Sequence, residues 1–459
     1  MAKIVSTNPS RNFEVIGEVE VSTVQEIEHA VEKANDAKTA WKELGLDKRI
    51  KFLRPVQEEF KARQNEIAKL ISSEVGKPIN ESLQEVEEYV EEFQWFMDNV
   101  KTSLAEEVTF EDKDSVHKVV YEPYGVAAVI MPWNFPFGMS ICGIVPNLLV
   151  GNTVVFKISE ECPIVGKTVE EIFNNHELPG GVFIELYGAG NEGEKLAKSS
   201  VNLIRFTGST KVGRGLYKIA AEKFIKVLLE MGGSSPCIVF EDMDIQKAAE
   251  VVYSSRFFNT GQTCDTTKRL IVHESIANDM VQALKSLIES KKLGDSLDKD
   301  TDLGSLVAER QVLAIEEQVR DAISRGAKAI TGGKRLEKLK GAYFDPTLLT
   351  DVTTDMRVWT EEVFGPVLPV ITFKTEEEAI RLANDTEYGL GGRVITKDFE
   401  RASRVASKIE AGTVEINEAD RWISPANPFG GYKLSGLGRE NGTVGFRELC
   451  QIKLISTSK

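Results

Sequence analysis

The chain has 459 residues, of which 42% are hydrophobic and 28% are charged. This length and composition allow two or three domains with a large buried core and exclude a disordered chain. Acidic residues outnumber basic ones, 71 against 56, and the net charge of −15 repels phosphate backbones and anionic lipid headgroups. Nucleic acid and membrane surfaces are therefore not expected partners.

The cysteines and histidines give no sign of a disulfide framework or a metal site. The five cysteines are an odd number without a C-x-x-C pair, and the four histidines are dispersed without ligand spacing. No apolar run approaches the roughly 20 residues that a membrane helix needs, and the N-terminus lacks the apolar stretch of a secretory signal. We expect a cytoplasmic enzyme that holds no metal.

The predicted elements change character near residue 118. Residues 22–99 carry apolar residues at helical spacing and predict amphipathic helices, with the acidic stretch 81–92 interpreted as a solvated helix face. From residue 118 onward, short apolar runs alternate with helical segments, which is typical of a parallel sheet with helices on both faces. The runs expected to be strands are 126–131, 153–156, 182–186, 203–206, 227–229, 237–240 and 270–272. A second series starts near residue 236, so the sequence predicts an α/β protein with two α/β domains.

Two glycine-containing turns follow predicted strands and could bind an anion. Residues 188–193 (GAGNEG) match G-x-G-x-x-G, but no acidic residue closes a second strand about 20 residues later, and an ordinary tight turn is the preferred interpretation. Residues 206–209 (FTGS) run directly into a predicted helix, whose N-terminal amides and dipole suit a phosphate. A simple helix N-cap by Ser209 or Thr210 explains the same pattern equally well.

Cys264 and Glu230 have sequence contexts that suit catalysis. Glycine and small polar residues precede Cys264, so its thiol is expected in a loop and not in the core. Glu230 ends a predicted buried strand, at the sheet edge where α/β proteins bind ligands, and could act as a general base. A buried filler cysteine and a solvated strand-end glutamate remain the alternatives at this point.

Seven motifs in order give the chain a resemblance to the aldehyde dehydrogenase superfamily across essentially its whole length. They are PWNFP (132–136), KISE (157–160), FTGS (206–209), EMGG (230–233), GQTC (261–264), EEVFGP (361–366) and PFGGYKLSG (428–436). The interval from residue 230 to residue 264 also matches the family.

The resemblance implies a Rossmann-like cofactor domain, an α/β catalytic domain and a small β oligomerisation element. The expected boundaries are 1–99 and 124–229 for the NAD(P)-binding domain, 230–440 for the catalytic domain, and 100–123 with 441–459 for the oligomerisation element. A projecting hairpin needs a partner subunit to cover its edges, so a homodimer or homotetramer is expected.

The resemblance also implies a mechanism for the oxidation of an aldehyde to a carboxylic acid. Cys264 would attack the aldehyde carbon as a thiolate, giving a thiohemiacetal and then, after hydride transfer, a thioester. The Asn134 side chain and the backbone N–H of Cys264 would stabilise the oxyanion. Glu230 would activate the water that hydrolyses the thioester.

The family's cofactor site maps onto seven positions of this sequence. Lys157 and Glu160 match the residues at the adenosine ribose, Gly208 and Ser209 those at the pyrophosphate, and Glu362 and Phe364 those at the nicotinamide ribose and ring; Trp133 is expected to line the cofactor cleft. A carboxylate at Glu160 would accept hydrogen bonds from the ribose hydroxyls of NAD and repel the 2′-phosphate of NADP. NAD is therefore favoured, with NADP possible.

Among subfamilies, the chain is most similar to the succinate-semialdehyde dehydrogenases. Residues 259–264 and the compact block 428–440 carry this similarity, and Ser424 matches a serine that helps to hold the substrate carboxylate there. Phe258, next to the first of these segments, is also expected to contact the substrate. Succinate semialdehyde is therefore the named substrate.

Several residues depart from that subfamily's pattern. The two arginines that usually clamp the carboxylate are replaced by Cys142 and Phe258, and Arg256 lies two residues too early to substitute for the second. Asp265 would repel an anionic substrate and raise the pKa of the adjacent thiol. Arg421, with its neighbour Trp422, could compensate. A neutral aliphatic or hydroxy-aldehyde remains the alternative substrate.

A CoA-acylating semialdehyde dehydrogenase, or an acyl-CoA reductase running in reverse, is the alternative activity. Such enzymes generally lack a working water-activating glutamate, so Glu230 argues against this assignment.

Overall fold

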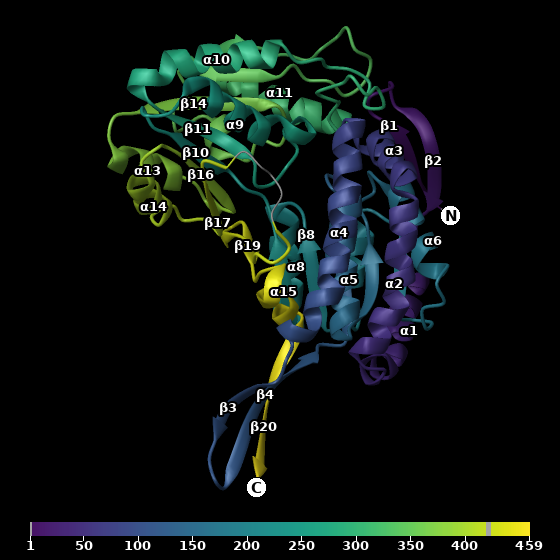
Figure 1. Cartoon of the computed structure of the whole chain (residues 1–459). Coiled ribbons are helices and arrows are strands. Elements are labelled where there is room, and N and C mark those ends of the chain that lie inside the picture. The colour runs from purple at the N-terminus through teal and green to yellow at the C-terminus, as the bar shows by residue number, and fades with distance from the viewer. Residues whose placement is uncertain (1, 419–423) are drawn as a thin grey trace.

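The computed structural model describes residues 2–418 and 424–459. The chain opens with a hairpin and a group of helices that lies beside the first sheet (Figure 1). Thr23 caps the first helix in a capping box with Glu26, and Gly76 ends the third in the left-handed region at φ 81°. These elements are β1 (Lys3–Asn8), β2 (Glu14–Glu20), α1 (Val24–Glu43), α2 (Leu46–Ala62), α3 (Gln64–Val75) and α4 (Ile79–Ser103).

The first large sheet has the strand order β19-β9-β8-β5-β6-β7, and only β19 is antiparallel to its neighbour. Its strands are β5 (Val126–Ile130), β6 (Thr153–Lys157), β7 (Phe183–Leu186), β8 (Leu203–Thr207), β9 (Lys226–Glu230) and β19 (Gly436–Leu437). The connecting helices are α5 (Pro136–Val150), α6 (Pro163–Asn174), α7 (Gly190–Lys198) and α8 (Thr210–Lys223). Alternate residues of β5 enter two separate hydrophobic cores, which explains why this strand is apolar throughout.

The second large sheet has seven strands in the order β12-β13-β14-β11-β10-β16-β17. They are β10 (Ser235–Val239), β11 (Thr267–His273), β12 (Lys328–Thr331), β13 (Thr347–Thr350), β14 (Val367–Phe373), β16 (Gly391–Ile395) and β17 (Thr413–Ile416), and all pairs except β12–β13 are parallel. The helices around it are α9 (Ile245–Phe257), α10 (Ala277–Glu289), α11 (Glu309–Ser324), α12 (Arg357–Thr360), α13 (Glu376–Asn384) and α14 (Phe399–Ala406). Short strands β15 (Tyr388–Gly389) and β18 (Tyr432–Lys433) pair with each other. The predicted α/β class with parallel sheets is therefore confirmed.

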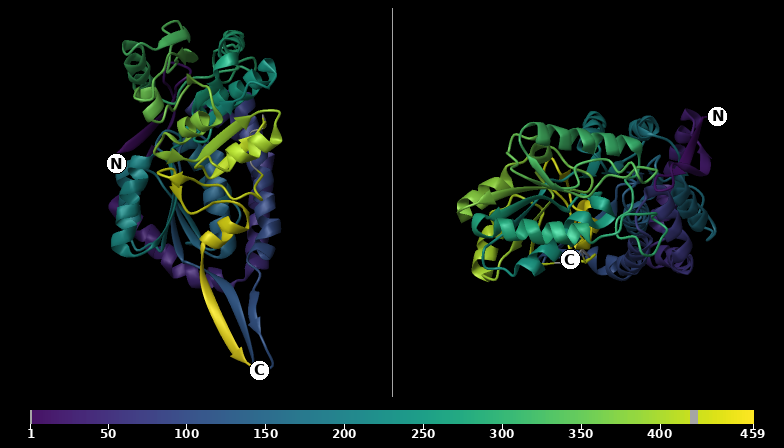
Figure 2. Two further views of the ribbon diagram at one scale, coloured as in Figure 1. Left: turned by 90° about the vertical axis from the view of Figure 1, so that its left-hand side faces the viewer. Right: turned by 90° about the horizontal axis from the view of Figure 1, so that it is seen from above.

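A three-stranded antiparallel arm projects away from both sheets (Figures 1 and 2). It consists of β3 (Glu107–Glu111), β4 (Ser115–Pro123) and the C-terminal β20 (Cys450–Ser458), which follows α15 (Gly442–Glu448). Strand β20 pairs with the whole length of β4, and large apolar side chains on the arm are exposed to solvent. The exposed apolar residues of the arm are Val108, Phe110, Ile452, Leu454 and Ile455.

None of the helices in the described part of the chain combines the length and the apolar character needed to cross a membrane.

Candidate active site

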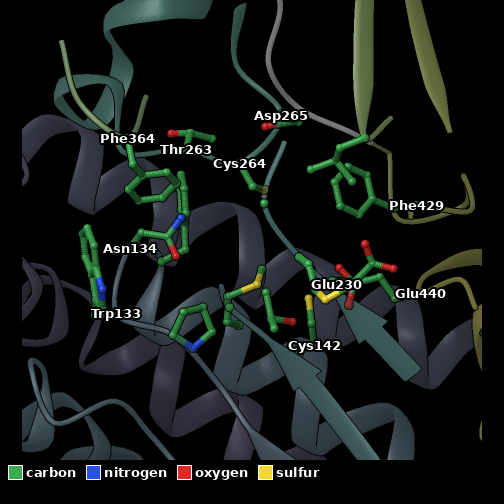
Figure 3. A pocket seen from close by; sticks show the side chains of 18 of the residues that line it. Trp133, Asn134, Cys142, Glu230, Thr263, Cys264, Asp265, Phe364, Phe429 and Glu440 are labelled. Atoms are coloured by element: carbon green, nitrogen blue, oxygen red, sulfur yellow. The ribbon is translucent and has the colours of Figure 1, made fainter. Parts of the chain in front are cut away.

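A cavity of about 390 Å³ brings together most of the residues singled out by the sequence (Figure 3). The predicted residues that line it are Cys264, Glu230, Asn134, Trp133, Gly208, Ser209, Glu362, Phe364 and Phe258. Its wall is built from the carboxyl ends of β8 and β9, the helices α4 and α5, and the loops after α9 and α12. Segments that are far apart in the sequence therefore meet at one site.

Cys264 follows a segment with unusual backbone geometry. Asn259, Thr260 and Gly261 lie consecutively in the left-handed region, at φ 46°, 53° and 75°. For residues other than glycine this conformation costs about 1–3 kcal/mol each, and such strain collects at functional sites. Two contacts hold it: the Asn259 backbone N–H donates to Glu81 (2.7 Å), and its side chain donates to the Asn134 carbonyl (2.9 Å).

Arg256 stabilises the same loop by hydrogen bonds to backbone carbonyl groups. Its fully buried guanidinium donates to the backbone carbonyls of Val367 (2.9 Å), Val363 (3.2 Å) and Gly365, and to that of Gly261 (3.4 Å). The arginine thereby ties the loop that carries the nucleophile candidate to the segment after Glu362. It is not part of the cavity wall, in agreement with the sequence-based expectation that it faces elsewhere.

We expect Arg256→Met to destabilise the protein strongly, because several buried carbonyls would lose their donor. A buried acceptor left without a partner costs about 1–3 kcal/mol, so a combined loss of about 3 kcal/mol or more should lower the melting temperature by several degrees. Differential scanning calorimetry measures this, with the exposed Arg381→Met as control. A melting temperature equal to that of the control would contradict this role.

The Cys264 thiol is half-buried and faces the cavity. Burial raises its pKa well above the ordinary value, the neighbouring carboxylates of Asp265 and Glu362 raise it further, and Lys268 opposes them. The expected effect of Asp265 on the thiol is therefore present. At neutral pH the thiol is protonated, so it needs a base to become a nucleophile.

Glu230 ends β9 with its carboxyl group buried in the cavity wall. The side chain is 3% exposed, and neither carboxyl oxygen has a hydrogen-bond partner among the described residues. Burial raises the pKa of Glu230 well above its ordinary value, and Glu440, which Figure 3 shows beside it, adds to this rise. A carboxyl group that is buried, unpaired and directed at the cavity has the properties of a general base.

Asn134 reaches the nucleophile loop from the turn between β5 and α5. Its side-chain NH₂ group donates to the carbonyl of Gln262 at 3.1 Å, two residues before Cys264. A primary amide has two N–H donors, so the second is available for a ligand in the cavity. The same loop holds Asn134 in place, because Asn259 donates to its backbone carbonyl.

The residues near the start of α8 fit a dinucleotide. Gly208 precedes the helix, and Ser209 is its N-cap, with Oγ accepting the N–H of Val212 at 3.5 Å. The capping role and the proposed anion contact therefore coexist, because the remaining N-terminal amides stay available. The hydroxyl of Thr207, at the end of β8, is buried without a hydrogen-bond partner and lines the cavity. A Cβ atom at position 208 would lie 2.6 Å from Cζ of the Phe206 ring, which is too close, so this turn requires glycine.

Glu362 faces this helix across the cavity. One of its carboxyl oxygens accepts the backbone N–H of Gly233 (3.1 Å) and lies 3.7 Å from Lys268 Nζ. The rings of Trp133 and Phe364 meet edge to face, with centroids 5.6 Å apart, and line the same cavity. A side chain at Gly232 would collide with Glu362, so the glycine leaves room for the carboxylate.

Three of the predicted site residues lie outside the cavity wall. Lys157 is buried, and its ammonium group donates to the carbonyls of Ile158 (2.7 Å) and Gly188 (2.9 Å), while burial lowers its pKa. Glu160 lies near enough to Lys157 to oppose that shift. Ser424 accepts the backbone N–H of Ala426 (3.4 Å) within a local turn.

The proposed substrate side contains Phe258, whose ring stacks on Phe135 with centroids 6.1 Å apart, and Cys142, which lines the cavity. Asp265 lines it as well. Arg421 and Trp422 lie outside the described residues. The loop 188–193 does not contribute to the wall and begins α7, in agreement with the tight-turn interpretation.

The interpretation of residues 81–92 as a solvated helix face holds for Glu87 and Glu91, which are exposed, but is wrong for the opposite side of the helix. Glu85 is buried, pairs with Lys77 and accepts the first free N–H groups of α5, those of Phe137 and Gly138 (both 3.1 Å). Glu92 is also buried. The residues of α4 that line the cavity are Gln84, Glu88, Tyr89 and Glu92. Positions 84, 88 and 92 are four residues apart, so the sequence already indicates that their side chains share one face of the helix.

No group of three or more histidine, cysteine, aspartate and glutamate side chains suited to a metal ion occurs within residues 2–418 and 424–459.

Comparison with known proteins agrees with this geometry. The model of the aldehyde dehydrogenase family matches residues 2–455. Aminoaldehyde dehydrogenase 1, peroxisomal, of Pisum sativum is 39% identical and covers 99% of this chain and 92% of its own length. Glutarate-semialdehyde dehydrogenase of Pseudomonas putida is 36% identical, with 98% and 94% covered.

Two solved structures extend the comparison. An E. coli NADP-dependent enzyme superposes with a TM-score of 0.96 at 34% identity, covering 100% of this chain and 95% of its own. Betaine aldehyde dehydrogenase from Staphylococcus aureus, in complex with NAD⁺, has a TM-score of 0.95 at 35% identity, with 99% and 91% covered. The chain therefore belongs to the aldehyde dehydrogenase family.

Proposed function

We propose that this oxidoreductase converts an aldehyde to a carboxylic acid through a covalent intermediate on Cys264. The observation that carries the proposal is the meeting of three groups in one cavity: the Cys264 thiol, the Asn134 amide and the buried Glu230 carboxyl. Hydride leaves a tetrahedral carbon more readily than a carbonyl carbon. A nucleophile, an oxyanion donor and a base are the parts that such chemistry needs.

In this proposal, Glu230 takes the proton of the Cys264 thiol, and the thiolate attacks the aldehyde carbon. The second N–H of Asn134 and the backbone N–H of Cys264 donate to the resulting oxyanion. After oxidation, a thioester joins the acyl group to Cys264. Once Glu230 has passed the thiol proton to solvent, its carboxylate removes a proton from water, whose oxygen attacks the thioester carbon. The tetrahedral adduct then expels the Cys264 thiolate, which takes up a proton, and the acid is released.

NAD is the proposed cofactor and supplies the hydride acceptor when bound. The structure of a betaine aldehyde dehydrogenase with NAD⁺ supports this choice, and the similarity to an NADP-dependent enzyme keeps NADP possible. The unpaired Thr207 hydroxyl and the start of α8 suit the pyrophosphate, and the Glu362 carboxylate suits a ribose. Trp133 and Phe364 would cover the nicotinamide ring, and Lys157 with Glu160 would hold the adenosine ribose.

We expect Glu160→Ser to raise the efficiency with NADP relative to that with NAD. The substitution removes a negative charge that would repel the 2′-phosphate and that accepts the ribose hydroxyls of NAD. The measurement is kcat/KM for each cofactor at a fixed aldehyde concentration, with Glu161→Ser as the adjacent control. An unchanged NADP-to-NAD ratio would contradict the assignment of Glu160 to the ribose.

Two aldehydes are candidates for the substrate, and the charge of the cavity wall helps to rank them. Succinate semialdehyde remains the prediction from sequence, and the similarity to a glutarate-semialdehyde dehydrogenase supports it. An aminoaldehyde is the other candidate, supported by the similarity to an aminoaldehyde dehydrogenase and by a cavity wall that, in its described part, carries six carboxyl groups and neither lysine nor arginine. We rank an uncharged or positively charged aldehyde first on this ground. A panel of aldehydes with NAD and NADP, followed by reduced-nicotinamide absorbance, tests the proposal.

CoA acylation is the alternative fate of the thioester. The buried Glu230 carboxyl favours water as the acceptor, because a CoA-dependent enzyme has no use for a water-activating base. An enzyme inactive until CoA is supplied would favour the alternative.

We also propose the domain assignment expected from the sequence: 1–99 and 124–229 for the cofactor, 230–440 for catalysis, and 100–123 with 441–459 for self-association. The exposed apolar residues of the arm support a homodimer or homotetramer, because a partner subunit would cover them. A cytoplasmic location stays a prediction from the unpaired cysteines.

A further inference from the structure

The part of the cavity across from the cofactor residues has an acidic, buried wall. Figure 3 shows Glu230, Glu440 and Cys142 on the side opposite Trp133 and Phe364. Glu92 of α4 belongs to the same wall and is 5% exposed. Because Trp133 and Phe364 are assigned to the cofactor, this acidic wall is on the side that remains for the tail of an aldehyde bound to Cys264.

The hydrogen-bond partners of Glu92 within the described residues are neutral. Its carboxyl group accepts the thiol of Cys142 (3.3 Å) and a side-chain hydrogen bond from Asn441. Arg205, the cation that lowers the pKa of Glu92, is already paired with Glu440 at 2.6 Å. Both Glu92 and its partner Asn441 line the cavity.

Acceptor atoms are in excess at this wall. The side-chain oxygen of Asn441 and both carboxyl oxygens of Glu230 are buried and have no hydrogen-bond partner in the part of the chain that the structure describes. A buried acceptor without a donor is costly, and a ligand that brings N–H donors would relieve this cost. A carboxylate in the same place would meet Glu92, Glu230 and Glu440 at once.

We propose that Glu92, with Asn441 beside it, forms the subsite for a positively charged group on the tail of the aldehyde, namely a primary ammonium group. This inference rests on the proposed function and narrows its substrate class to aminoaldehydes. A primary ammonium carries three N–H donors, enough for the Glu92 carboxylate and the Asn441 oxygen together. Glu92 then acts as a specificity residue and takes no part in the chemistry at Cys264.

The protonation of Glu92 gives this subsite a pH dependence. The pKa of Glu92 is raised to about 8, chiefly by burial and in addition by Glu440, against the lowering effects of Cys142, Arg205 and Asn441. Below this pKa the group is a neutral acid, and above it a carboxylate. An ammonium group binds the carboxylate better, so binding should strengthen as pH rises toward and past the pKa.

The experiment compares 3-aminopropanal with butanal, which has the same number of non-hydrogen atoms and no charge. The quantity measured is the ratio of their kcat/KM values with NAD, since effects of Cys264 and Glu230 on the chemical steps cancel in it. We expect Glu92→Gln to lower this ratio by about tenfold or more, mainly through the KM for 3-aminopropanal, because a hydrogen bond between charged groups is lost. Glu87→Gln, an exposed acid on the same helix, should leave the ratio unchanged.

A second measurement needs no variant. In the unmodified enzyme the ratio should rise between about pH 6.5 and about pH 8.5, a range in which a primary amine stays protonated. In Glu92→Gln the ratio should be flat over the same range. The pH dependence of the unmodified enzyme therefore tests the subsite even if the variant folds poorly.

The outcomes separate the subsite from the proposed function. A ratio in Glu92→Gln equal to that of Glu87→Gln, a ratio independent of pH in the unmodified enzyme, or a higher kcat/KM for succinate semialdehyde than for 3-aminopropanal would overturn the subsite. Oxidation of butanal in those cases would leave the proposed function intact. Failure to oxidise any of the three aldehydes with NAD or NADP would overturn the proposed function itself.

Discussion

Replacement of Cys264 by serine should abolish aldehyde oxidation. A serine hydroxyl keeps the size of the side chain but is a far weaker nucleophile than a thiolate at the same position. Loss of a covalent nucleophile commonly lowers turnover by about 10⁴-fold or more. Affinity for NAD should change little, because the thiol is assigned to the aldehyde and not to the dinucleotide. Steady-state absorbance and a calorimetric titration with NAD measure the two quantities.

The other buried cysteines provide the control for this prediction. Cys162 is fully buried at the start of α6 and does not line the cavity. Cys162→Ala should therefore keep its dehydrogenase activity once folded. Substantial turnover in Cys264→Ser, or equal losses in both variants, would contradict the assignment of Cys264 as the nucleophile.

The sequence predicts the setting of Glu230 and Cys264 well, because neighbouring residues determine where a strand ends and where a loop forms. Glu230 was placed at the end of a buried strand because a run of apolar residues precedes it, and β9 ends at that residue. Cys264 was placed in a loop because glycine and small polar residues precede it, and three successive left-handed residues precede it in the structure. Both predictions depend on local sequence alone and therefore do not require knowledge of distant contacts.

Sequence reasoning failed where a side chain's surroundings come from distant segments. An acidic helix face is usually solvated, but Glu85 is buried because Lys77 and the start of α5 give it partners. The same holds for Glu92, whose partner Cys142 lies fifty residues further along the chain. Helical spacing shows which residues share a face, whereas the packing that buries a face is set by tertiary contacts.

Positions carried over from a resemblance also need their three-dimensional setting. Lys157 was assigned to the adenosine ribose, yet its ammonium group donates to two backbone carbonyls and is 4% exposed. Its role in binding the cofactor stays a proposal that the Glu160 experiment tests indirectly. No sequence pattern distinguishes a lysine that reaches a ligand from one that braces the adjacent loop.

The Glu230→Gln variant should separate formation of the thioester from its hydrolysis. The substitution keeps the shape of the side chain and removes the base, so hydrolysis should slow by about 10²–10⁴-fold, the usual contribution of a general base. If solvent or another group can deprotonate Cys264, acylation continues. The expected trace is a burst of reduced cofactor in proportion to the active sites, followed by slow turnover, measured by stopped-flow absorbance. The exposed Glu222→Gln serves as control.

The raised pKa of Glu230 adds a pH signature to this experiment. Burial and Glu440 raise the pKa of this carboxyl well above its ordinary value, so the fraction of active base in the unmodified enzyme grows as pH increases toward and past that raised pKa. Its turnover should therefore rise toward alkaline pH, and Glu230→Gln should lose that part of the rise. A small thiol added to the variant should restore part of the turnover, because it cleaves the thioester without a base.

Two results would contradict the role of Glu230: unmodified steady-state rates in Glu230→Gln, or an unmodified enzyme inactive without CoA. Complete loss of the burst would instead indicate that Glu230 also deprotonates Cys264, whose own pKa is raised by burial and by Asp265. Repeating the burst at higher pH separates the two functions, because the thiolate then forms without help. A burst that returns at alkaline pH, with hydrolysis still slow, would assign both proton transfers to the same buried carboxyl group.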